Sequence, residues 1–598
     1  MPSNVAKDLK AFWRRLHGEA APAHEDIRVS IDQRPLGQHL RIALYAVAVG
    51  VIAGVAEVAF RYVIRGTTFV FFGFEDGDIL DLVADLPWWH VLFAPAIGGL
   101  LIGFFIQKFM VGQRPHGVPD VILASYHGHG RLPPKALLGA ALISATSAGV
   151  GASVGREGPM VHLGASLGSW VGQTLKISEY DTKTLLACGV AAGVAASFNV
   201  PLAGTIFAFE VLLMRYSIQR LAPVAIAAVI ATAISRVVFG DFPAFRVPEQ
   251  VLVSFWEFPA FALLGVCCAI AGYALIASVR GVGAFMNKSP VPKILRPALG
   301  GLIVGAIALE LPQVLSVGYG ATTEALAGSY GLTLLLALLV GKIVATSVCL
   351  GCGFGGGIFS PSLLVGAALG GAFGMIATML APEYSSGHVA YTIVGMGAVA
   401  GAVMGAPLQA ILILFEMTSS YALALGVMLA VVIASLVLND GLRIDFFRWQ
   451  ISLRGIRLGE PRPQVTLADM VLGPLTREAA TVAADADAAT LAAALEAAGA
   501  GGVFVVDADG RLVGRLGAPQ LLPHLAADAA AVSAENLALP VEPLLRDTHD
   551  AADAWRLLED SGLDRLPVVD GAETRRVVGQ LDRAAVLKSY EGALKDSG

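Results

Sequence analysis

The chain has 598 residues, of which 56% are hydrophobic and only 15% are charged. Soluble domains carry about 25% charged residues and disordered chains are poor in apolar ones, so this composition excludes both classes and indicates a membrane protein. The net charge of −6 carries little information, because the polar ends of the chain dominate it. The sequence predicts no nucleic-acid partner.

Glycine accounts for 68 residues, above the roughly 7% of average usage, as expected where membrane helices approach one another closely. No disulfide framework is predicted, because all five cysteines lie in apolar stretches: Cys188, Cys267, Cys268, Cys349 and Cys352. The last two have CxxC spacing but neither a second pair nor a nearby histidine, so we predict no metal site.

The chain divides into parts of different polarity. Residues 1–36 are polar and basic and lack the apolar core of a signal peptide. Residues 37–441 predict an all-α polytopic membrane domain, because they contain segments near spanning length: 40–60, 92–111, 221–239, 258–280, 330–350 and 422–439. Residues 442–463 are a linker, and from 464 the composition is that of a soluble α/β domain.

Basic residues flank the membrane region on both sides. They are Lys7, Lys10, Arg14 and Arg15 before it, and Arg443, Arg448, Arg454 and Arg457 after it. Because cytoplasmic loops carry an excess of Lys and Arg, the chain is predicted to cross the cytoplasmic (inner) membrane many times, with both termini cytoplasmic.

The segment Gly155-Arg156-Glu157-Gly158-Pro159 places a charged pair among glycines inside an apolar run. An intramembrane carboxylate is expensive unless it is paired or faces water, so Glu157 is a functional candidate by default. The glycines interrupt the helix and free backbone N–H groups at the start of the next one, and such helix N-termini bind anions. The segment therefore predicts an anion pathway with an acidic plug.

An internal repeat relates two halves of the membrane region. Gly164-Ala165-Ser166-Leu167-Gly168 returns as Gly366-Ala367-Ala368-Leu369-Gly370, and Gly189…Pro201-Leu202…Glu210 returns as Gly397…Pro407-Leu408…Glu416, at offsets of 202 to 208. The interruption in the second half is Gly355–Pro361. Matching interrupted helices in two halves predict a binding site at their interface, where two helix dipoles would add on one anion.

In these residues the chain resembles the CLC chloride channel and transporter family. The matching motifs are Gly155–Pro159 (GREGP), Gly356–Pro361 (GGxFxP) and Phe198–Gly204. The resemblance implies an inverted repeat assembled as a homodimer with one pore per subunit. It also implies that Glu157 is the gating glutamate and that the backbone amides of Ile358 and Phe359 hold the anion. The anion site is expected to comprise His116, Gly117, Arg156, Gly158, Gly357, Ile358, Phe359 and Phe447.

Three positions depart from the family pattern. Where the family has GSGIP, this chain has Pro115-His116-Gly117-Val118-Pro119, so the anion-contacting serine becomes His116. The imidazole can donate to an anion, with a pH dependence of its own, or it turns away and fills space. The family's anion-coordinating tyrosine corresponds to Phe447, which has no hydroxyl. At the position of the internal proton glutamate stands Val211, which favours channel-like transport over chloride/proton antiport.

Some of these residues also have structural interpretations. In the structural interpretation, Glu157 and Arg156 form a buried ion pair that holds helix ends together. For Arg156 we favour this structural role. Glu210 and Glu416 recur in both halves, as expected of helix-end architecture. His162 is expected to be an interior histidine rather than a ligand.

The C-terminal region has a repeat of its own. Gly501–Asp507…Gly514 recurs as Leu566–Asp570…Gly579, and each strand signal follows a helix-like stretch. The pattern resembles a CBS-domain pair, with domains at 464–530 and 531–593, which we interpret as a dimer-stabilising platform. The resemblance would place adenine-nucleotide contacts at Gly517 with Gln520 and at Asp582 with Ala585, and because neither pair keeps both ribose contacts, no bound nucleotide or other cofactor is predicted.

The sequence therefore predicts selective transport of chloride, or a similar small anion, gated by Glu157. Chloride/proton antiport on the same scaffold is the alternative. A membrane enzyme is not predicted, because no nucleophile, base and metal ligands converge. A non-transporting sensor would need intact ligand residues in the CBS pair.

Overall fold

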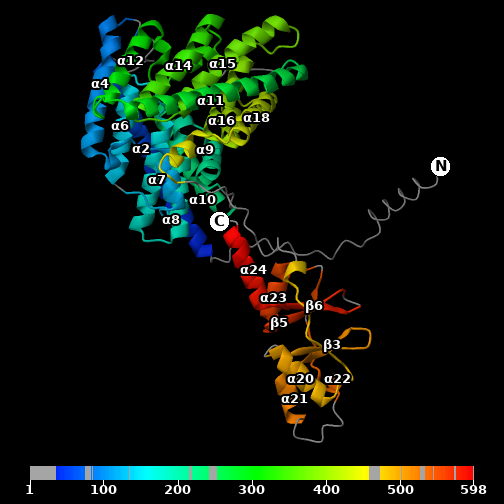
Figure 1. Cartoon of the computed structure of the whole chain (residues 1–598). Coiled ribbons are helices and arrows are strands. Elements are labelled where there is room, and N and C mark those ends of the chain that lie inside the picture. Colours follow the sequence, from blue (N-terminus) through cyan, green and yellow to red (C-terminus); the bar gives the residue numbers. More distant parts are fainter. Residues whose placement is uncertain are drawn as a thin grey trace, which may run out of the picture. The chain divides into compact units, whose positions relative to one another are not determined.

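The computed structural model describes residues 36–73, 83, 85–133, 135–214, 218–241, 245, 252–456, 472–499, 502–524, 533–542, 544–547, 549–571 and 574–596. The chain forms two compact units, Met1–Leu458 and Gly459–Gly598 (Figure 1). The basic N-terminal residues Lys7, Lys10, Arg14 and Arg15 lie outside the described residues. So do residues 457–463 of the predicted linker, Arg457 among them, and Gly501 of the C-terminal repeat. The rest of that predicted linker, 442–456, is described and contains the helix Phe446–Ser452.

The described part of the first unit is helical throughout. The helices of its first half are α2 (Leu36–Phe72), α4 (Trp88–Phe109), α5 (Val118–Tyr126), α6 (Lys135–Gly149), α7 (Glu157–Thr174), α8 (Glu179–Phe198), α9 (Pro201–Phe207) and α10 (Ile218–Phe239). Helix α9 continues directly into a π-helical turn, Ala208–Leu213. A bundle of helices with short connections results, in agreement with the predicted all-α domain.

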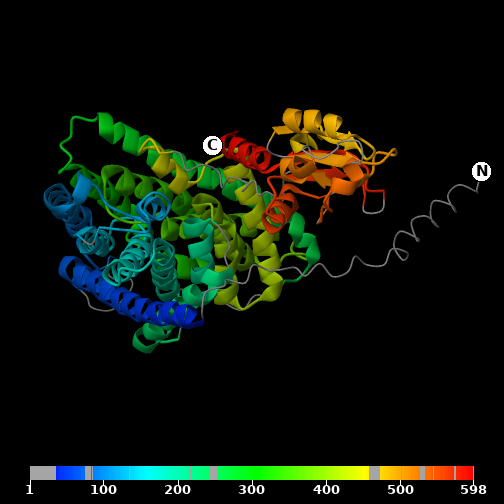
Figure 2. The same ribbon diagram turned by 90° about the horizontal axis from the view of Figure 1, so that it is seen from below.

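The second half begins with α11, which runs along the whole unit (Figure 2). Its helices are α11 (Phe258–Lys288), α12 (Arg296–Glu310), α13 (Tyr319–Leu326), α14 (Leu332–Cys352), α15 (Phe359–Leu380), α16 (His388–Met404), α17 (Pro407–Thr418), α18 (Tyr421–Ser435) and α19 (Phe446–Ser452). Each half thus has its interrupting segment just before a long helix, α7 in the first and α15 in the second.

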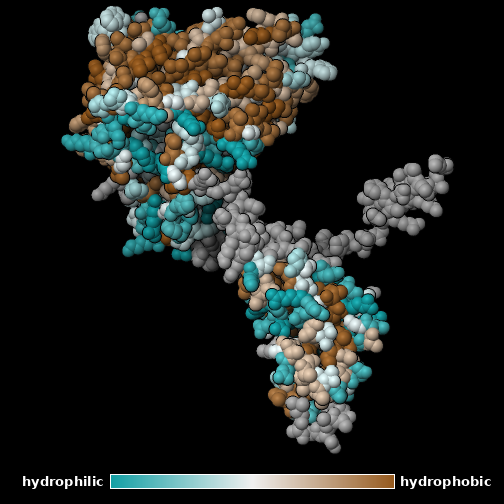
Figure 3. Space-filling view, in the orientation of Figure 1, coloured by the Kyte–Doolittle hydropathy of each residue, from teal (hydrophilic) through white to brown (hydrophobic). Residues whose placement is uncertain are grey.

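Among the described residues, seven helices are long and apolar enough to cross a membrane. They include all six segments predicted from hydropathy, and Phe359–Leu380, which follows the second glycine segment, is the seventh. Hydrophobic side chains form a broad band on the visible face of this unit, with hydrophilic residues gathered at one end (brown and teal in Figure 3). The first unit is therefore a polytopic membrane domain.

Glycines let paired helices touch backbone to backbone. A Cβ added at Gly164 on α7 would lie 2.1 Å from the carbonyl oxygen of Gly189 on α8, and one added at Gly366 on α15 would lie 2.3 Å from that of Gly395 on α16. Both distances are far below a van der Waals contact, so only glycine fits. The repeated glycines of the sequence are thus explained by close helix pairing in each half.

The two repeated glutamates, Glu210 and Glu416, each form hydrogen bonds with the opposite half of the membrane unit. The carboxylate of Glu210 accepts hydrogen bonds from the amides of Leu408 (3.0 Å) and Gln409 (2.8 Å) at the start of α17. The carboxylate of Glu416 accepts from Leu202 (3.0 Å) and Ala203 (2.8 Å) at the start of α9. Each glutamate satisfies the helix N-terminus of the opposite half, so both have a role in helix-end architecture.

The second unit contains two three-stranded sheets, in the orders β1-β2-β3 and β4-β5-β6. In each, the first pair of strands is parallel and the second antiparallel. The elements are β1 (Thr481–Ala483), α20 (Ala488–Ala498), β2 (Val503–Val506), β3 (Leu512–Leu516), α21 (Ala518–Leu521), α22 (Ala534–Leu537), β4 (Leu545–Arg546), α23 (Ala551–Ser561), β5 (Arg565–Val569), β6 (Val577–Asp582) and α24 (Arg583–Asp596). The predicted pair of β-α-β repeats is confirmed.

Replacement of Gly164 by alanine is expected to lower the free energy of unfolding by about 1–3 kcal/mol or more, because the methyl group overlaps the Gly189 carbonyl. The matched control is Gly281→Ala on α11, where an added Cβ meets nothing within 4 Å. Heating purified protein in detergent and measuring the fraction that stays monodisperse compares the two variants. Equal stability of both would contradict the tight pairing of α7 and α8.

Candidate functional site

The two glycine segments are hydrogen-bonded to each other. The amide of Gly155 donates to the carbonyl oxygen of Gly357 at 2.7 Å, and the amide of Gly357 donates to that of Gly155 at 2.6 Å. The two residues are equivalent under the 202-residue repeat. A contact in which equivalent residues exchange identical bonds is what a two-fold axis produces, so the pseudo-symmetry axis passes between them.

Close approach explains why glycine occupies these positions. A Cβ at Gly155 would lie 2.8 Å from Oε2 of Glu157 and 3.1 Å from the Gly357 carbonyl oxygen. A Cβ at Gly356 would lie 2.4 Å from the Cβ of Val154. Side chains here would separate the two segments and move the starts of α7 and α15 apart.

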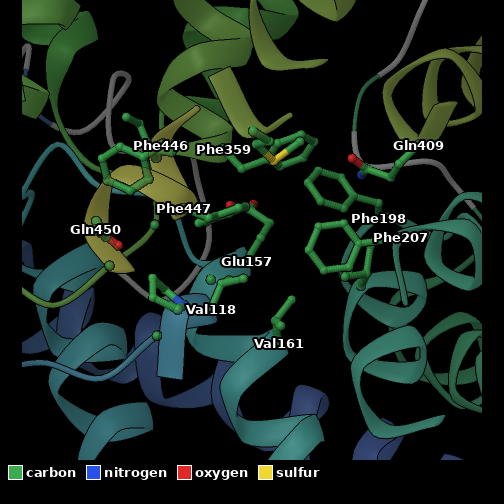
Figure 4. Close-up of a pocket in the computed structure, with 18 residues that line it drawn as sticks. Val118, Glu157, Val161, Phe198, Phe207, Phe359, Gln409, Phe446, Phe447 and Gln450 are labelled. Carbon is green, nitrogen blue, oxygen red and sulfur yellow. The ribbon is translucent and has the colours of Figure 1, made fainter. Parts of the chain in front are cut away.

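A cavity of about 50 Å³ lies beside this pair of segments, several times the volume that one water molecule needs. Three helices begin at its wall and contribute Gly117, Val118 and Pro119 from α5, Glu157 and Gly158 from α7, and Ile358 and Phe359 from α15. Phe198 and Phe207 line one side, and Phe446, Phe447 and Gln450 line another (Figure 4). The positive ends of three helix dipoles thus face one small, largely apolar space.

The first amides of a helix have no partner within it. Glu157 and Gly158 open α7, and Ile358 and Phe359 open α15, so their N–H groups are directed to the cavity end of each helix. Gly117 differs, because its amide already donates to Oδ2 of Asp120 at 3.0 Å. Gly357 also differs, since its amide is bonded to Gly155. Both line the cavity without offering it a free N–H group.

Glu157 is only 4% exposed and lies at the cavity. Its Oε1 accepts hydrogen bonds from the hydroxyl of Tyr319 (2.7 Å) and from that of Ser360. Its Oε2 is buried and has no hydrogen-bond partner among the residues that the structure describes. The carboxylate is thus held on one oxygen while the other is left without a donor among the described residues. Figure 4 shows Glu157 among the side chains that line the cavity.

Arg156 points away from the cavity, whose lining residues do not include it. Its Nη2 donates to the carbonyl oxygen of Ser197 (3.2 Å) at the C-terminus of α8, and its guanidinium lies 4.5 Å from the centre of the Tyr319 ring. Arg61 on α2 donates to the same carbonyl oxygen at 2.9 Å and is paired with Glu57. Arg156 therefore neutralises the negative end of α8, and no ion pair joins it to Glu157 in the described part of the chain.

The imidazole of His116 is likewise absent from the cavity wall. Its Nε2 lies 3.0 Å from the carbonyl oxygen of Val111 and its Nδ1 lies 3.5 Å from Oδ1 of Asp120. Asp120 is also bound by Arg114 (2.6 Å) and Arg454 (3.0 Å). In this arrangement a carbonyl and a carboxylate face the two ring nitrogens, so the imidazole is not directed at the cavity where the anion is expected. Of the two sequence interpretations, the structure matches the one in which the ring turns away.

The remaining predicted positions divide between the wall and the interior. Phe447 lines the cavity. Val211 is buried in the π-helical turn and does not line it, and His162 is 1% exposed, with its ring 5.8 Å from that of His116. The five cysteines are free, and no group of metal-binding side chains is found among the described residues.

Sequence reasoning missed Tyr319, Ser360 and Gln409. Ser360 lies inside the second motif, and only its contact with Glu157 was unforeseen. Gln409 lines the cavity, is 1% exposed, and in the described part of the chain its Oε1 has no hydrogen-bond partner. Gln409 is a polar residue in the otherwise apolar helix α17, and the equivalent position in the first half of the repeat is Ala203. This difference is a signal that could have identified Gln409. Tyr319 carries no such signal.

In the second unit, the polar groups at the expected nucleotide positions bond within the protein. Oε1 of Gln520 accepts from the amide of Gly517 at 3.0 Å. The carboxylate of Asp582 is paired with Arg565 (3.1 Å) and Arg477 (3.6 Å).

Comparison with known proteins gives a consistent result. The sequence profile of the voltage-gated chloride channel family matches residues 98–439, and that of the CBS domain matches residues 540–592. The chain is 37% identical to a ClcB-like chloride channel protein of Ralstonia nicotianae over 387 residues, covering 64% of this chain and 90% of the relative. It is 31% identical to the voltage-gated ClC-type chloride channel ClcB of Escherichia coli over 413 residues, covering 68% of this chain and 98% of the relative.

Solved structures show the same fold. A slow cyanobacterial Cl⁻/H⁺ antiporter superposes with a TM-score of 0.63 at 25% identity, over 69% of this chain and 98% of the antiporter. A eukaryotic CLC transporter superposes with a TM-score of 0.59 at 18% identity, over 92% of this chain and 99% of the transporter. The resemblance inferred from the motifs is therefore confirmed, and the chain belongs to the voltage-gated chloride channel (CLC) family, with a CBS region at its C-terminus.

Proposed function

We propose that this protein transports chloride across the membrane through the cavity between its two halves, with Glu157 as the gate. The observation that carries the proposal is a buried carboxylate in a small cavity onto which three helix N-termini converge. Positive helix ends attract anions, and the Glu157 carboxylate is itself an anion tethered at the same place. When the Glu157 side chain is ionised, it competes with chloride for the anion site. When it is protonated, it leaves that site free for chloride.

The anion is proposed to bind the backbone amides of Gly158, Ile358 and Phe359, with Phe447 and Gly357 forming apolar wall around it. Backbone amides and apolar walls suit a weakly hydrated halide, since they supply partial charge without holding the ion too tightly to leave. Arg156 contributes at a distance by stabilising α8 and Tyr319. His116 and Gly117 position the start of α5 through Asp120.

Channel-like passage is proposed over proton-coupled exchange. Val211 stands where coupled relatives carry a second glutamate, and a valine side chain cannot carry a proton. The adjacent Glu210 is already bonded to two amides of α17. Antiport is the second candidate, and the structural similarity to a cyanobacterial Cl⁻/H⁺ antiporter favours it.

We further propose a homodimer in the cytoplasmic membrane, with one pore per subunit and both termini on the cytoplasmic side. Family membership and the basic residues that flank the membrane region support this assembly and orientation. The CBS region is proposed to act as a platform that stabilises the dimer.

Glu157→Gln is expected to abolish the pH dependence of anion flux. A neutral amide cannot compete electrostatically for the anion site, so flux in the variant should stay near the low-pH maximum of the parent protein. Chloride efflux from proteoliposomes between about pH 4 and pH 7.5, which brackets the usual carboxylate range, measures this. Glu324→Gln, at an exposed carboxylate of α13, is the matched control, and an unaltered pH profile in Glu157→Gln would rule out the gate.

Because Val211 cannot carry a proton, we expect that protons are not transported together with chloride. The reversal potential in planar bilayers should follow the chloride gradient alone, at about 59 mV per tenfold gradient of a univalent ion. Changing the pH on one side at constant chloride should not move it. A reproducible displacement with pH would establish antiport, with protons taking a route that does not need residue 211.

His116→Ser is expected to leave the preference among chloride, nitrate and bromide unchanged, because the imidazole faces Val111 and Asp120 rather than the cavity. The contrasting variant is Phe447→Tyr, which adds a hydroxyl donor to a residue that does line the cavity and should change that preference. Competition between anions in efflux assays gives the order for each. A changed order in His116→Ser would show that the imidazole enters the pathway.

A further inference from the structure

Two hydroxyl groups hold the Glu157 carboxylate at the cavity, and the proposed gating function does not explain them. The Tyr319 hydroxyl donates to Oε1 at 2.7 Å, and the Ser360 hydroxyl donates to the same oxygen. Tyr319 opens α13, and Ser360 belongs to the first turn of α15. The carboxylate of one half is thus bound by donors from two separate helices of the other half.

The segment before Tyr319 is rigidly built. Lys342 on α14 is fully buried, and its Nζ donates to the carbonyl oxygens of Val314 and Ser316, each at 3.0 Å. Ser316 in turn donates through its amide to Gly151 (2.9 Å) and through its hydroxyl to Ala148 (2.9 Å). This turn is therefore fixed to the connection that leads from α6 to Glu157.

The ring of Tyr319 is fixed on its faces as well. The Arg156 guanidinium lies 4.5 Å from the ring centre, and the Phe245 ring centre lies 4.7 Å away. The Phe198 ring, which lines the cavity, lies at 6.3 Å. With its ring clamped, the hydroxyl cannot follow the carboxylate if Glu157 leaves the cavity wall.

We propose that the hydroxyls of Tyr319 and Ser360 form a latch that holds ionised Glu157 in the anion pathway and sets the pH at which flux begins. The proposal rests on the gating role of Glu157 and deepens it. Hydrogen bonds to an ionised carboxylate are roughly twice as strong as those to a neutral acid. The latch therefore favours the docked, ionised carboxylate, and protonation weakens the hold and frees the side chain.

Other titratable groups surround Glu157 but do not bind its carboxylate. Arg156 precedes it, and on α2 Arg61 pairs with Glu57 and donates to the carbonyl oxygen of Ser197. His116 just before α5, Asp120 on α5 and His162 on α7 form a separate cluster, while α15 has no charged residue. In the described part of the chain, the two hydroxyls are thus the direct donors to Glu157.

Tyr319→Phe is the decisive variant, because it removes the hydroxyl and keeps the ring that packs against Arg156 and Phe245. The pH of half-maximal chloride flux should move upward by about one unit, as expected for the loss of one charge-assisted bond. Ser360→Ala should shift it in the same direction. The matched control is Tyr391→Phe, which removes a buried hydroxyl beside Glu257, away from the cavity, and should leave the midpoint in place.

Each change is repeated in the Glu157→Gln background, where no ionised carboxylate remains to be held. There, Tyr319→Phe and Ser360→Ala should have no further effect on flux at any pH. The latch is overturned if both single variants keep the parent midpoint, if their effects persist in the Glu157→Gln background, or if Tyr391→Phe shifts the midpoint equally. A pH profile that survives Glu157→Gln itself would instead overturn the gate, so the two failures are distinguishable.

Discussion

The reciprocal hydrogen bonds between Gly155 and Gly357 are the interaction on which the membrane unit depends. Two chain segments leave helical geometry in the middle of an apolar bundle, where an unpaired backbone group costs several kcal/mol. By pairing with each other, the segments satisfy these groups without water or side chains. The same pairing fixes where α7 and α15 begin and therefore directs two helix N-termini toward one cavity.

The exchange of polar groups between equivalent halves recurs through the molecule. Glu210 and Glu416 each satisfy the helix start of the opposite half. In the second unit, Arg477 exchanges backbone bonds with Gln580 in β6, and Leu539 exchanges them with Arg515 in β3. In each case one repeat supplies what the other lacks. A single half would leave these groups unsatisfied, so the halves of each unit are expected to fold together.

Much of this frame could be predicted from the sequence, because it follows local rules. Glycine and proline mark the interrupted helices, the fixed offset reveals the repeat, and apolar length reveals the spans. Helix ends were less predictable: hydropathy ended one segment at 280, whereas α11 continues to Lys288, since a helix does not need apolar residues beyond the membrane. The orientation of His116 depends on Asp120, Arg114 and Arg454, and no local pattern encodes it. Tyr319 reaches Glu157 across 162 positions, so only the folded chain brings the two together.

The pseudo-symmetry has a consequence for the direction of transport. Under the 202-residue repeat, the counterpart of Glu157 is Phe359, and the counterpart of Arg156 is Ile358. The backbone frame around the cavity is thus nearly two-fold symmetric, but its charge is not. A symmetric frame alone would treat ions arriving from either side alike. With a single carboxylate on one half, the proposed pathway is expected to have an uneven energy profile, so that equal and opposite driving forces would produce unequal currents. On the proposed transport function, the chain is therefore expected to act as a rectifier whose polarity is set by the half that carries the acid.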